Sequence, residues 1–131
     1  MYKIIVFSHG TLAESLLNTS KLILGEQEDV EAYCVEPGCN LEELRDKVRM
    51  SVQRSNQLNQ QVLVLTDLMY GTPFNIMIQM EEEGSFRHIT GMNLPLLLEA
   101  INRRGIGGGV DGLEEIGRQG IIDSRTLLQM V

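Results

Sequence analysis

The sequence has no tryptophan, few cysteines and no long apolar run, and each scarcity excludes a class of protein. The longest apolar runs, such as Leu94 to Leu98, fall far short of the roughly 20 residues that a membrane-spanning helix needs. Met1-Tyr2-Lys3 leads straight into the apolar Ile4 to Phe7, without the zones of a secretory signal. We therefore expect a cytoplasmic protein.

Only two cysteines are present, Cys34 and Cys39, with four residues between them. That spacing fits neither a redox pair nor a structural zinc site without further ligands. In a reducing compartment both should be free thiols. The sequence thus predicts no disulfide and no metal site.

Basic residues are also scarce. The 11 Lys and Arg face 18 Asp and Glu, which gives a net charge of -7. Nucleic-acid domains usually show a basic stripe, so we expect no nucleic-acid partner. An acidic surface suits a basic protein partner, although it is also typical of soluble proteins in general.

What is present is a regular alternation of short apolar runs and helical patterns. With 131 residues, 43% of them hydrophobic, the chain has the size of one domain, residues 1-131. Alternating strands and helices predict a doubly wound α/β fold with a mostly parallel sheet. The expected strands are Ile4 to Phe7, Val30 to Val35, Val62 to Leu65 and Arg87 to Thr90. Helices are expected to begin at Thr11 and at Leu94. Another should follow Asn40, whose side chain caps it while Glu43 reaches back. A further helix should begin at Thr72 as the cap, with Pro73 in its first position.

The tail has a different composition. Gly105 to Gly109 contains four glycines in five positions, which predicts a flexible connection after a core of residues 1-104. Val110 to Arg118 could hold a short helix, and a last strand is expected near Gly120 to Asp123. Residues 105-131 are therefore interpreted as a connection and a tail.

Two polar residues end the first and third expected strands, His9 and Asp67. In doubly wound sheets, chemistry sits where strands end and the winding reverses. Neutral histidine is a competent nucleophile near pH 7, and a carboxylate that holds one ring N–H leaves the other nitrogen free to attack. This pattern predicts a nucleophilic His9 oriented by Asp67. The alternative is a polar strand end and an ordinary turn residue.

A phosphorylated imidazole needs donors for the phosphoryl oxygens. The start of the helix at Thr72 offers unpaired backbone N–H groups, a partial positive charge and a hydroxyl. Gly71 would let the backbone come close, and Gly10 and Thr11 offer the same beside His9. These four residues are the predicted phosphoryl-binding set.

Three other residues carry weaker expectations. His88 begins the weak fourth strand beside Arg87, and we expect it at the surface, at the opposite end of the sheet from the site. Met69 and Met92 fall on loops at the active end, where they could line a docking patch.

Several motifs together resemble the mannose-family enzyme IIA of the bacterial phosphotransferase system. They are Ser8-His9-Gly10, Leu22 to Glu26, Thr66-Asp67 followed by Gly71-Thr72-Pro73-Phe74-Asn75, and Gly91-Met92-Asn93-Leu94-Pro95. The match runs from about residue 3 to residue 103.

The resemblance implies that His9 accepts a phosphoryl group from the phosphohistidine of HPr and passes it to a IIB component. Asp67 matches the family's supporting acid, and Thr72 matches a phosphoryl-binding position that is serine in many members. No cofactor or metal is implied, and the membrane components IIC and IID would be met only indirectly. The family also forms homodimers, in which a carboxy-terminal strand adds an antiparallel edge to the partner's sheet.

Other functions fit parts of the sequence. A receiver domain phosphorylated on Asp67 should carry an acidic pair after the first strand, where this chain has Ser8-His9. A flavin carrier should offer more aromatic cover than three tyrosines and no tryptophan. A dihydroxyacetone-kinase phosphocarrier subunit resembles the chain around the first histidine but differs in the later motifs. A non-enzymatic, flavodoxin-like interaction module remains the alternative outside phosphoryl transfer.

Overall fold

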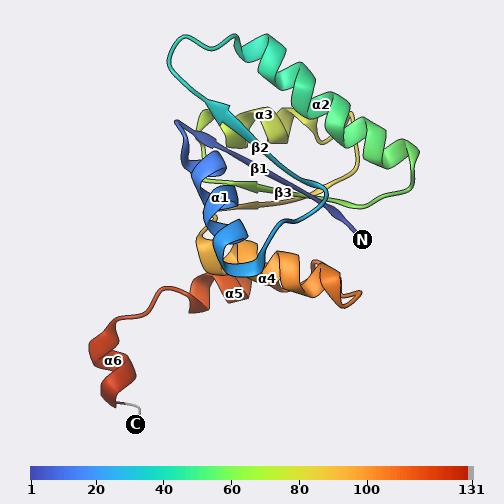
Figure 1. Cartoon of the computed structure of the whole chain (residues 1–131). Coiled ribbons are helices and arrows are strands. Elements are labelled where there is room, and N and C mark those ends of the chain that lie inside the picture. Colours follow the sequence, from blue (N-terminus) through green and yellow to red (C-terminus); the bar gives the residue numbers. More distant parts are fainter. Residues whose placement is uncertain (130–131) are drawn as a thin grey trace.

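Four short strands form one parallel sheet in a computed structural model that describes residues 1–129 (Figure 1). The strands are β1 (Lys3–His9), β2 (Val30–Val35), β3 (Val62–Thr66) and β4 (Arg87–Thr90). Their order across the sheet is β2-β1-β3-β4, and all neighbours run parallel. The winding direction therefore reverses between β1 and β3, as expected for a doubly wound fold.

Helices cover both faces of this sheet. α2 and α3 lie on one face, and α1, α4 and α5 lie on the other (Figure 1). The helices are α1 (Leu12–Leu24), α2 (Leu41–Gln57), α3 (Thr72–Met80), α4 (Leu94–Gly105), α5 (Leu113–Gln119) and α6 (Ser124–Gln129). None of the helices within residues 1–129 combines the length and apolarity needed to cross a bilayer. The predicted fold class is confirmed for the parallel sheet and its helical layers.

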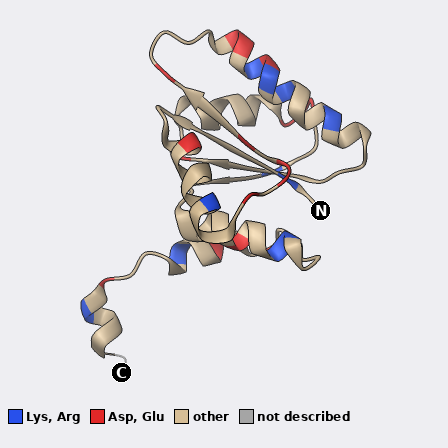
Figure 2. Cartoon of the chain, in the orientation of Figure 1, with Lys and Arg blue, Asp and Glu red and all other residues tan. Residues whose placement is uncertain are grey.

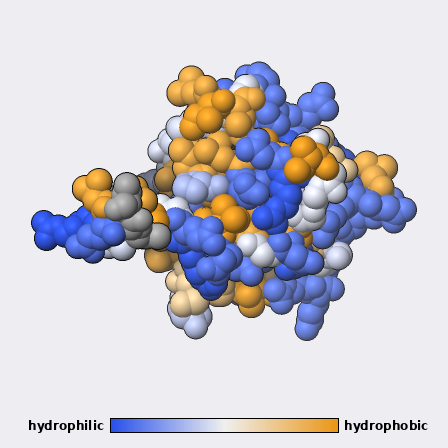
Figure 3. Space-filling view, turned by 90° about the horizontal axis from the view of Figure 1, so that it is seen from below, coloured by the Kyte–Doolittle hydropathy of each residue, from blue (hydrophilic) through white to orange (hydrophobic). Residues whose placement is uncertain are grey.

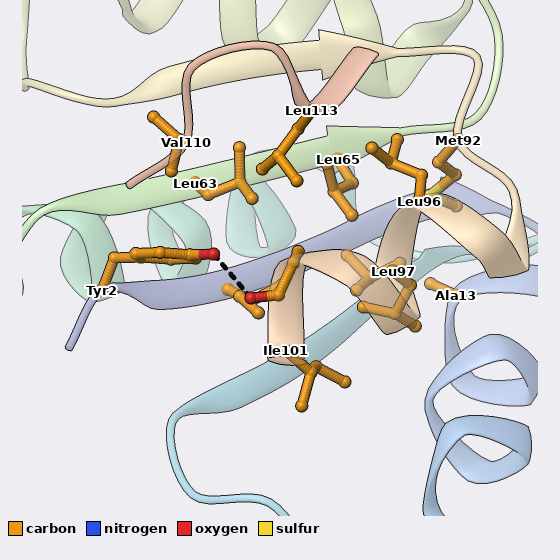
Figure 4. Packing of buried hydrophobic residues seen from close by; sticks show 13 residues of the cluster. Tyr2, Ala13, Leu63, Leu65, Met92, Leu96, Leu97, Ile101, Val110 and Leu113 are labelled. Atoms are coloured by element: carbon orange, nitrogen blue, oxygen red, sulfur yellow. Dashed lines mark hydrogen bonds between the residues drawn. The ribbon is translucent and has the colours of Figure 1, made fainter. Parts of the chain in front are cut away.

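Alternation along β1 explains why both faces are covered. Ile4 and Val6 point into the cluster beneath α1 and α4, whereas Ile5 and Phe7 point into the cluster beneath α2 and α3. A strand buried on both faces needs apolar side chains at every position, which is why it reads as a continuous apolar run. In the first cluster the Tyr2 hydroxyl donates to the Ala100 carbonyl at 2.5 Å, so its polar end is satisfied (Figure 4).

Asparagine caps start two of the helices. The Asn40 side chain accepts from the Glu43 backbone N–H at 3.1 Å, as predicted. The Glu43 carboxylate pairs with Lys47 instead of reaching back to the cap. Asn93 caps α4 in the same way. Charged residues of both signs line the exposed side of α2 (Figure 2).

The glycine-rich segment is a bonded turn instead of the predicted flexible connection. The Gly108 N–H donates to the Arg103 carbonyl at 2.8 Å, and the Arg103 guanidinium reaches the Asp111 carbonyl at 2.7 Å. Val110 and Leu113 are buried in the same cluster as Tyr2 and Ala100. The compact part of the chain thus extends past the expected boundary at residue 104, through the predicted short helix.

The expected strand near Gly120 to Asp123 is wrong for the single chain. Residues 121–123 form no strand, and the helix α6 follows them. Residues 120–129 are all exposed and project away from the sheet (Figures 1 and 3). An edge strand needs a second backbone as its hydrogen-bonding partner, whereas a helix forms its hydrogen bonds within one segment. A segment that packs against no strand therefore forms a helix, here α6. The predicted antiparallel edge is therefore not formed within one chain. The last two residues of the predicted domain 1-131 lie outside the described residues.

Candidate functional site

His9 is the last residue of β1, and its side chain is 44% exposed. The turn that follows is fixed from both sides. The buried Ser8 hydroxyl accepts from the Ala13 N–H at 2.7 Å, which caps the first turn of α1. Gly10 takes a left-handed conformation (φ 56°) and donates its N–H to the Val35 carbonyl at 2.8 Å. Gly10 therefore supplies the turn. The sequence predicted that its N–H would bind a phosphoryl oxygen, but that N–H is already bonded to Val35.

Asp67 follows β3, the strand beside β1, and it holds His9 through one carboxylate oxygen. Asp67 Oδ2 accepts from the His9 backbone N–H at 3.0 Å and lies 2.9 Å from the ring nitrogen Nδ1. The Asp67 side chain is only 12% exposed. An ionised carboxylate is an acceptor only, so this contact selects the neutral tautomer in which Nδ1 carries the proton and Nε2 keeps its lone pair. The structure thus brings together the two residues that the sequence singled out.

Gly71 forms a wall against the His9 ring. A Cβ atom at this position would lie 2.5 Å from Cε1 and 3.2 Å from Nε2 of the imidazole. Its φ of −77° is open to any residue, so the requirement is for space and not for backbone freedom. The sequence suggested that Gly71 allows a close approach, and the group that approaches it is the imidazole itself.

The amino end of α3 starts at this wall. The N-cap residue is Gly71, one position before the predicted cap at Thr72. The first turn of a helix leaves N–H groups without intrahelical acceptors and carries a partial positive charge. The half-buried Thr72 adds its hydroxyl there. Thr11 lies on the other side, exposed at the start of α1, without a side-chain cap bond.

Exposed apolar side chains follow Asp67 in the loop before α3 and begin α1 after His9. Leu68, Met69 and Tyr70, between Asp67 and Gly71, are 60%, 55% and 75% exposed, and Leu12 at the start of α1 is 44% exposed. Met69 is therefore available for docking as expected. Met92 is not, because it is 8% exposed and packs into the core beneath α4.

The expectation for His88 is wrong. Its ring lies under α3, with Nε2 2.8 Å from the Thr66 hydroxyl oxygen and its centroid 5.4 Å from that of Phe74. Burial lowers the pKa of His88 to about 4, so the ring is neutral near pH 7. Its position opposite Val64 in the sheet register was readable only once the pairing of β3 and β4 was known.

Fold and site together define a doubly wound α/β protein with a carboxylate-oriented histidine at the reversal point of its sheet. A family model described as "PTS system fructose IIA component" matches residues 3–113. The chain belongs to this EIIA-man family of phosphotransferase-system IIA components. The predicted family is therefore confirmed.

Individual relatives agree with the family. The chain is 33% identical over 123 residues to the mannose-specific EIIAB component of Escherichia coli K12, covering 90% of this chain and 38% of that protein. It is 29% identical to the fructose-specific EIIA component of Bacillus subtilis, covering 79% and 71% respectively. The chain thus spans well under half of the E. coli relative.

A solved structure has nearly the same extent. The EIIA component from Streptococcus agalactiae superimposes with a TM-score of 0.84 at 32% identity, covering 96% of this chain and 99% of that one. The IIA protein associated with the fucose utilisation operon of Streptococcus pneumoniae gives the same TM-score at 31% identity, covering 97% and 96%.

Proposed function

We propose that this chain is a phosphoryl carrier that accepts a phosphoryl group on His9 Nε2 from the phosphohistidine of HPr and passes it to a IIB component. The observation that carries the proposal is the 2.9 Å contact between His9 Nδ1 and Asp67 Oδ2. It occupies one ring nitrogen and leaves the other on a ring that is 44% exposed. An exposed nucleophile is what transfer between two proteins requires.

The chemistry follows from these positions. The Nε2 lone pair attacks phosphorus, and the N–P bond to the donor histidine breaks as the Nε2–P bond forms. The Nδ1 proton stays in place, and the Asp67 carboxylate stabilises the positive charge that develops on the ring. The amino end of α3, with Thr72, faces the negative charge of the phosphoryl oxygens. The transfer exchanges one phosphohistidine for another, so positioning matters more than barrier lowering.

Partner docking is the next part of the proposal. The apolar side chains Leu12, Leu68, Met69 and Tyr70 would contact HPr and the IIB component in turn. Aromatic and methionine side chains are enriched at such contacts. The membrane components IIC and IID would be reached only through the IIB component. A cytoplasmic location belongs to this proposal and is compatible with the free thiols of Cys34 and Cys39.

A homodimer is also proposed. Ile121, Ile122, Leu127 and Leu128 are 53% or more exposed on the projecting tail, which makes no strand of its own. β4 has a neighbour on one side only, so its outer edge can accept another strand. A second copy of the chain would cover the apolar side chains of the tail and would pair a strand with the free edge of β4. Sedimentation of the intact chain and of a variant with Leu127 and Leu128 replaced by Ser tests this, and a monomeric intact chain would contradict it.

Incubation with phosphoenolpyruvate, enzyme I and HPr tests the carrier function. We expect one acid-labile phosphate, mapped to the peptide that contains His9, and none in His9→Ala. The fold should be unchanged in that variant because the exposed ring makes its contact at the surface. A label on His88, or a His9→Ala protein that is still labelled, would contradict the site assignment.

A further inference from the structure

One half-buried titratable group has no part in the proposed transfer, namely His88 of β4, a strand at the edge of the sheet. Its Nε2 is bonded to the Thr66 hydroxyl at 2.8 Å, and Thr66 is fully buried. One face of its ring lies against Phe74 in the first turn of α3, at a centroid distance of 5.4 Å. A half-buried histidine loses part of its hydration, and as an apolar filler it gains nothing that leucine would not give.

The contacts of His88 run toward His9 along two routes. The first is short, because Thr66 immediately precedes Asp67, whose carboxylate holds the His9 ring. Along this route, the Thr66 carbonyl also accepts the Met92 N–H at 3.0 Å, which fixes the end of β3.

The second route passes through aromatic rings. Phe74 lies edge-on to Tyr70 at a centroid distance of 5.5 Å. Tyr70 holds an uncommon left-handed conformation (φ 67°), and Asn75 donates to its carbonyl at 3.2 Å. The next residue is Gly71, the wall of the His9 ring. The contacts of His88 therefore lead to the carboxylate and to the wall between which the imidazole is held.

We propose that His88 and Thr66 are positioning residues for His9, the hydrogen bond between them fixing the His88 ring as the support on which the first turn of α3 rests. This inference rests on the proposed carrier function, because the geometry it preserves is that of the attacking nitrogen. A hydrogen bond fixes the plane of a ring better than apolar packing alone. The ring is neutral near pH 7, so it adds no charge that would compete for Asp67.

Four variants separate positioning from simple stability. Thr66→Val keeps the shape of the side chain and removes the bond, and His88→Leu removes it from the other side. His88→Gln keeps a neutral group that can bond to the Thr66 hydroxyl. Ser55→Ala is the matched control, because Ser55 is a fully buried hydroxyl bonded to Gln60 at 2.9 Å, at the other end of the sheet.

The first measurement is the rate of phosphoryl transfer from phosphorylated HPr as a function of its concentration. We expect kcat to fall about tenfold in Thr66→Val and His88→Leu, because small displacements of a reacting group are costly. KM should change less than kcat, since every docking side chain is kept and only Tyr70 contacts the displaced Phe74 ring. His88→Gln should recover most of the rate, and Ser55→Ala should match the unaltered protein. The double variant Thr66→Val/His88→Leu should be no slower than the slower single variant.

Nitrogen NMR of the His9 ring gives a readout that does not need phosphoryl transfer. The unaltered protein should show one tautomer with the proton on Nδ1, and Thr66→Val should show a second tautomer or exchange broadening that Ser55→Ala lacks. Equal kcat in Thr66→Val and Ser55→Ala, together with identical His9 spectra, overturns the proposal. If the unaltered protein accepts no phosphoryl group, the carrier function fails, and the NMR comparison alone then decides the positioning role.

Discussion

The two ends of the sheet differ in what they offer to other molecules. At the amino ends of the strands lie two hollows of about 440 and 430 Å³, which share Asn59, Gln60 and Gln61. Neither reaches His9, which stands on open surface at the carboxyl end. Both hollows thus lie away from the proposed nucleophile. An exposed nucleophile with an apolar surround suits a protein substrate, whereas an enclosed pocket suits a small molecule.

The polar groups at the two ends are also used differently. At the amino end they bond to one another: Asn56 exchanges hydrogen bonds with Ser85, and Gln60 bonds to Ser55, Asp29 and the Met1 carbonyl. At the carboxyl end, Asp67 leaves one nitrogen of His9 unengaged, and its Oδ1 atom is buried without a partner within the described residues. Groups that bond to one another stabilise structure, whereas a ring nitrogen without a partner is available for chemistry. Variants at the two ends should therefore affect different quantities.

The largest effect on stability is expected at the amino end. Arg104 is 4% exposed and donates to the carbonyls of Tyr2, Asp29 and Glu28. Arg104→Met should lower the free energy of unfolding by about 3 kcal/mol, because three backbone carbonyls lose a charged donor at once. Urea unfolding measures this loss, and phosphoryl transfer below the unfolding transition should be unchanged. The exposed Arg54→Met is the control, and a slower transfer in Arg104→Met would break the separation of the two ends.

The largest effect on transfer, short of removing His9, is expected for Asp67→Asn. The amide lacks the charge that stabilises the developing imidazolium, and it can present N–H to Nδ1 and so favour the wrong tautomer. Transfer should slow about a hundredfold. Rapid-quench measurement of the phosphorylated protein gives the rate, and urea unfolding gives the accompanying stability. An unchanged rate would show that the carboxylate has no role in transfer.

The pH dependence of stability distinguishes His88 from the exposed histidine. The pKa of His88 is about 4 in the folded chain, against about 6.5 for an unperturbed histidine, because burial disfavours its charged form. The unfolded chain therefore binds more protons between these values. Stability is complete above pH 6.5 and falls as the pH drops from 6.5 to 4.

The size of this effect is about 2 kcal/mol, since part of the ring keeps contact with water. Urea unfolding of the unaltered chain and of His88→Gln at pH 7 and pH 4 measures it. The carboxylates titrate equally in both proteins and cancel in the difference. The two proteins should lose different amounts of stability, and equal losses would show that His88 is already hydrated in the folded state.

Local patterns in the sequence were sufficient for the strands and helices up to α4, because the continuous apolar run of β1 and the Asn40 cap are encoded within a few residues. The pairing of His9 with Asp67 also followed, since adjacent strand ends in a doubly wound sheet must meet. The partial burial of His88 did not follow, because it depends on how Phe74 of α3 packs against His88 of β4. The tail was misjudged for a similar reason: a strand near Gly120 needs a second backbone that the local sequence does not contain.

Gly71 gives the smallest and most local test of the carboxyl end. In Gly71→Ala the new methyl group would lie 2.5 Å from Cε1 of His9, so the ring or the loop must move. Because the backbone conformation at Gly71 suits alanine, the fold should keep its stability while transfer slows by about tenfold. Gly105→Ala is the matched control, since Gly105 ends α4 with nothing within 4 Å of the added Cβ. Equal transfer rates in the two variants would mean that the wall at Gly71 does not define the position of the nucleophile, and that Asp67 alone orients it.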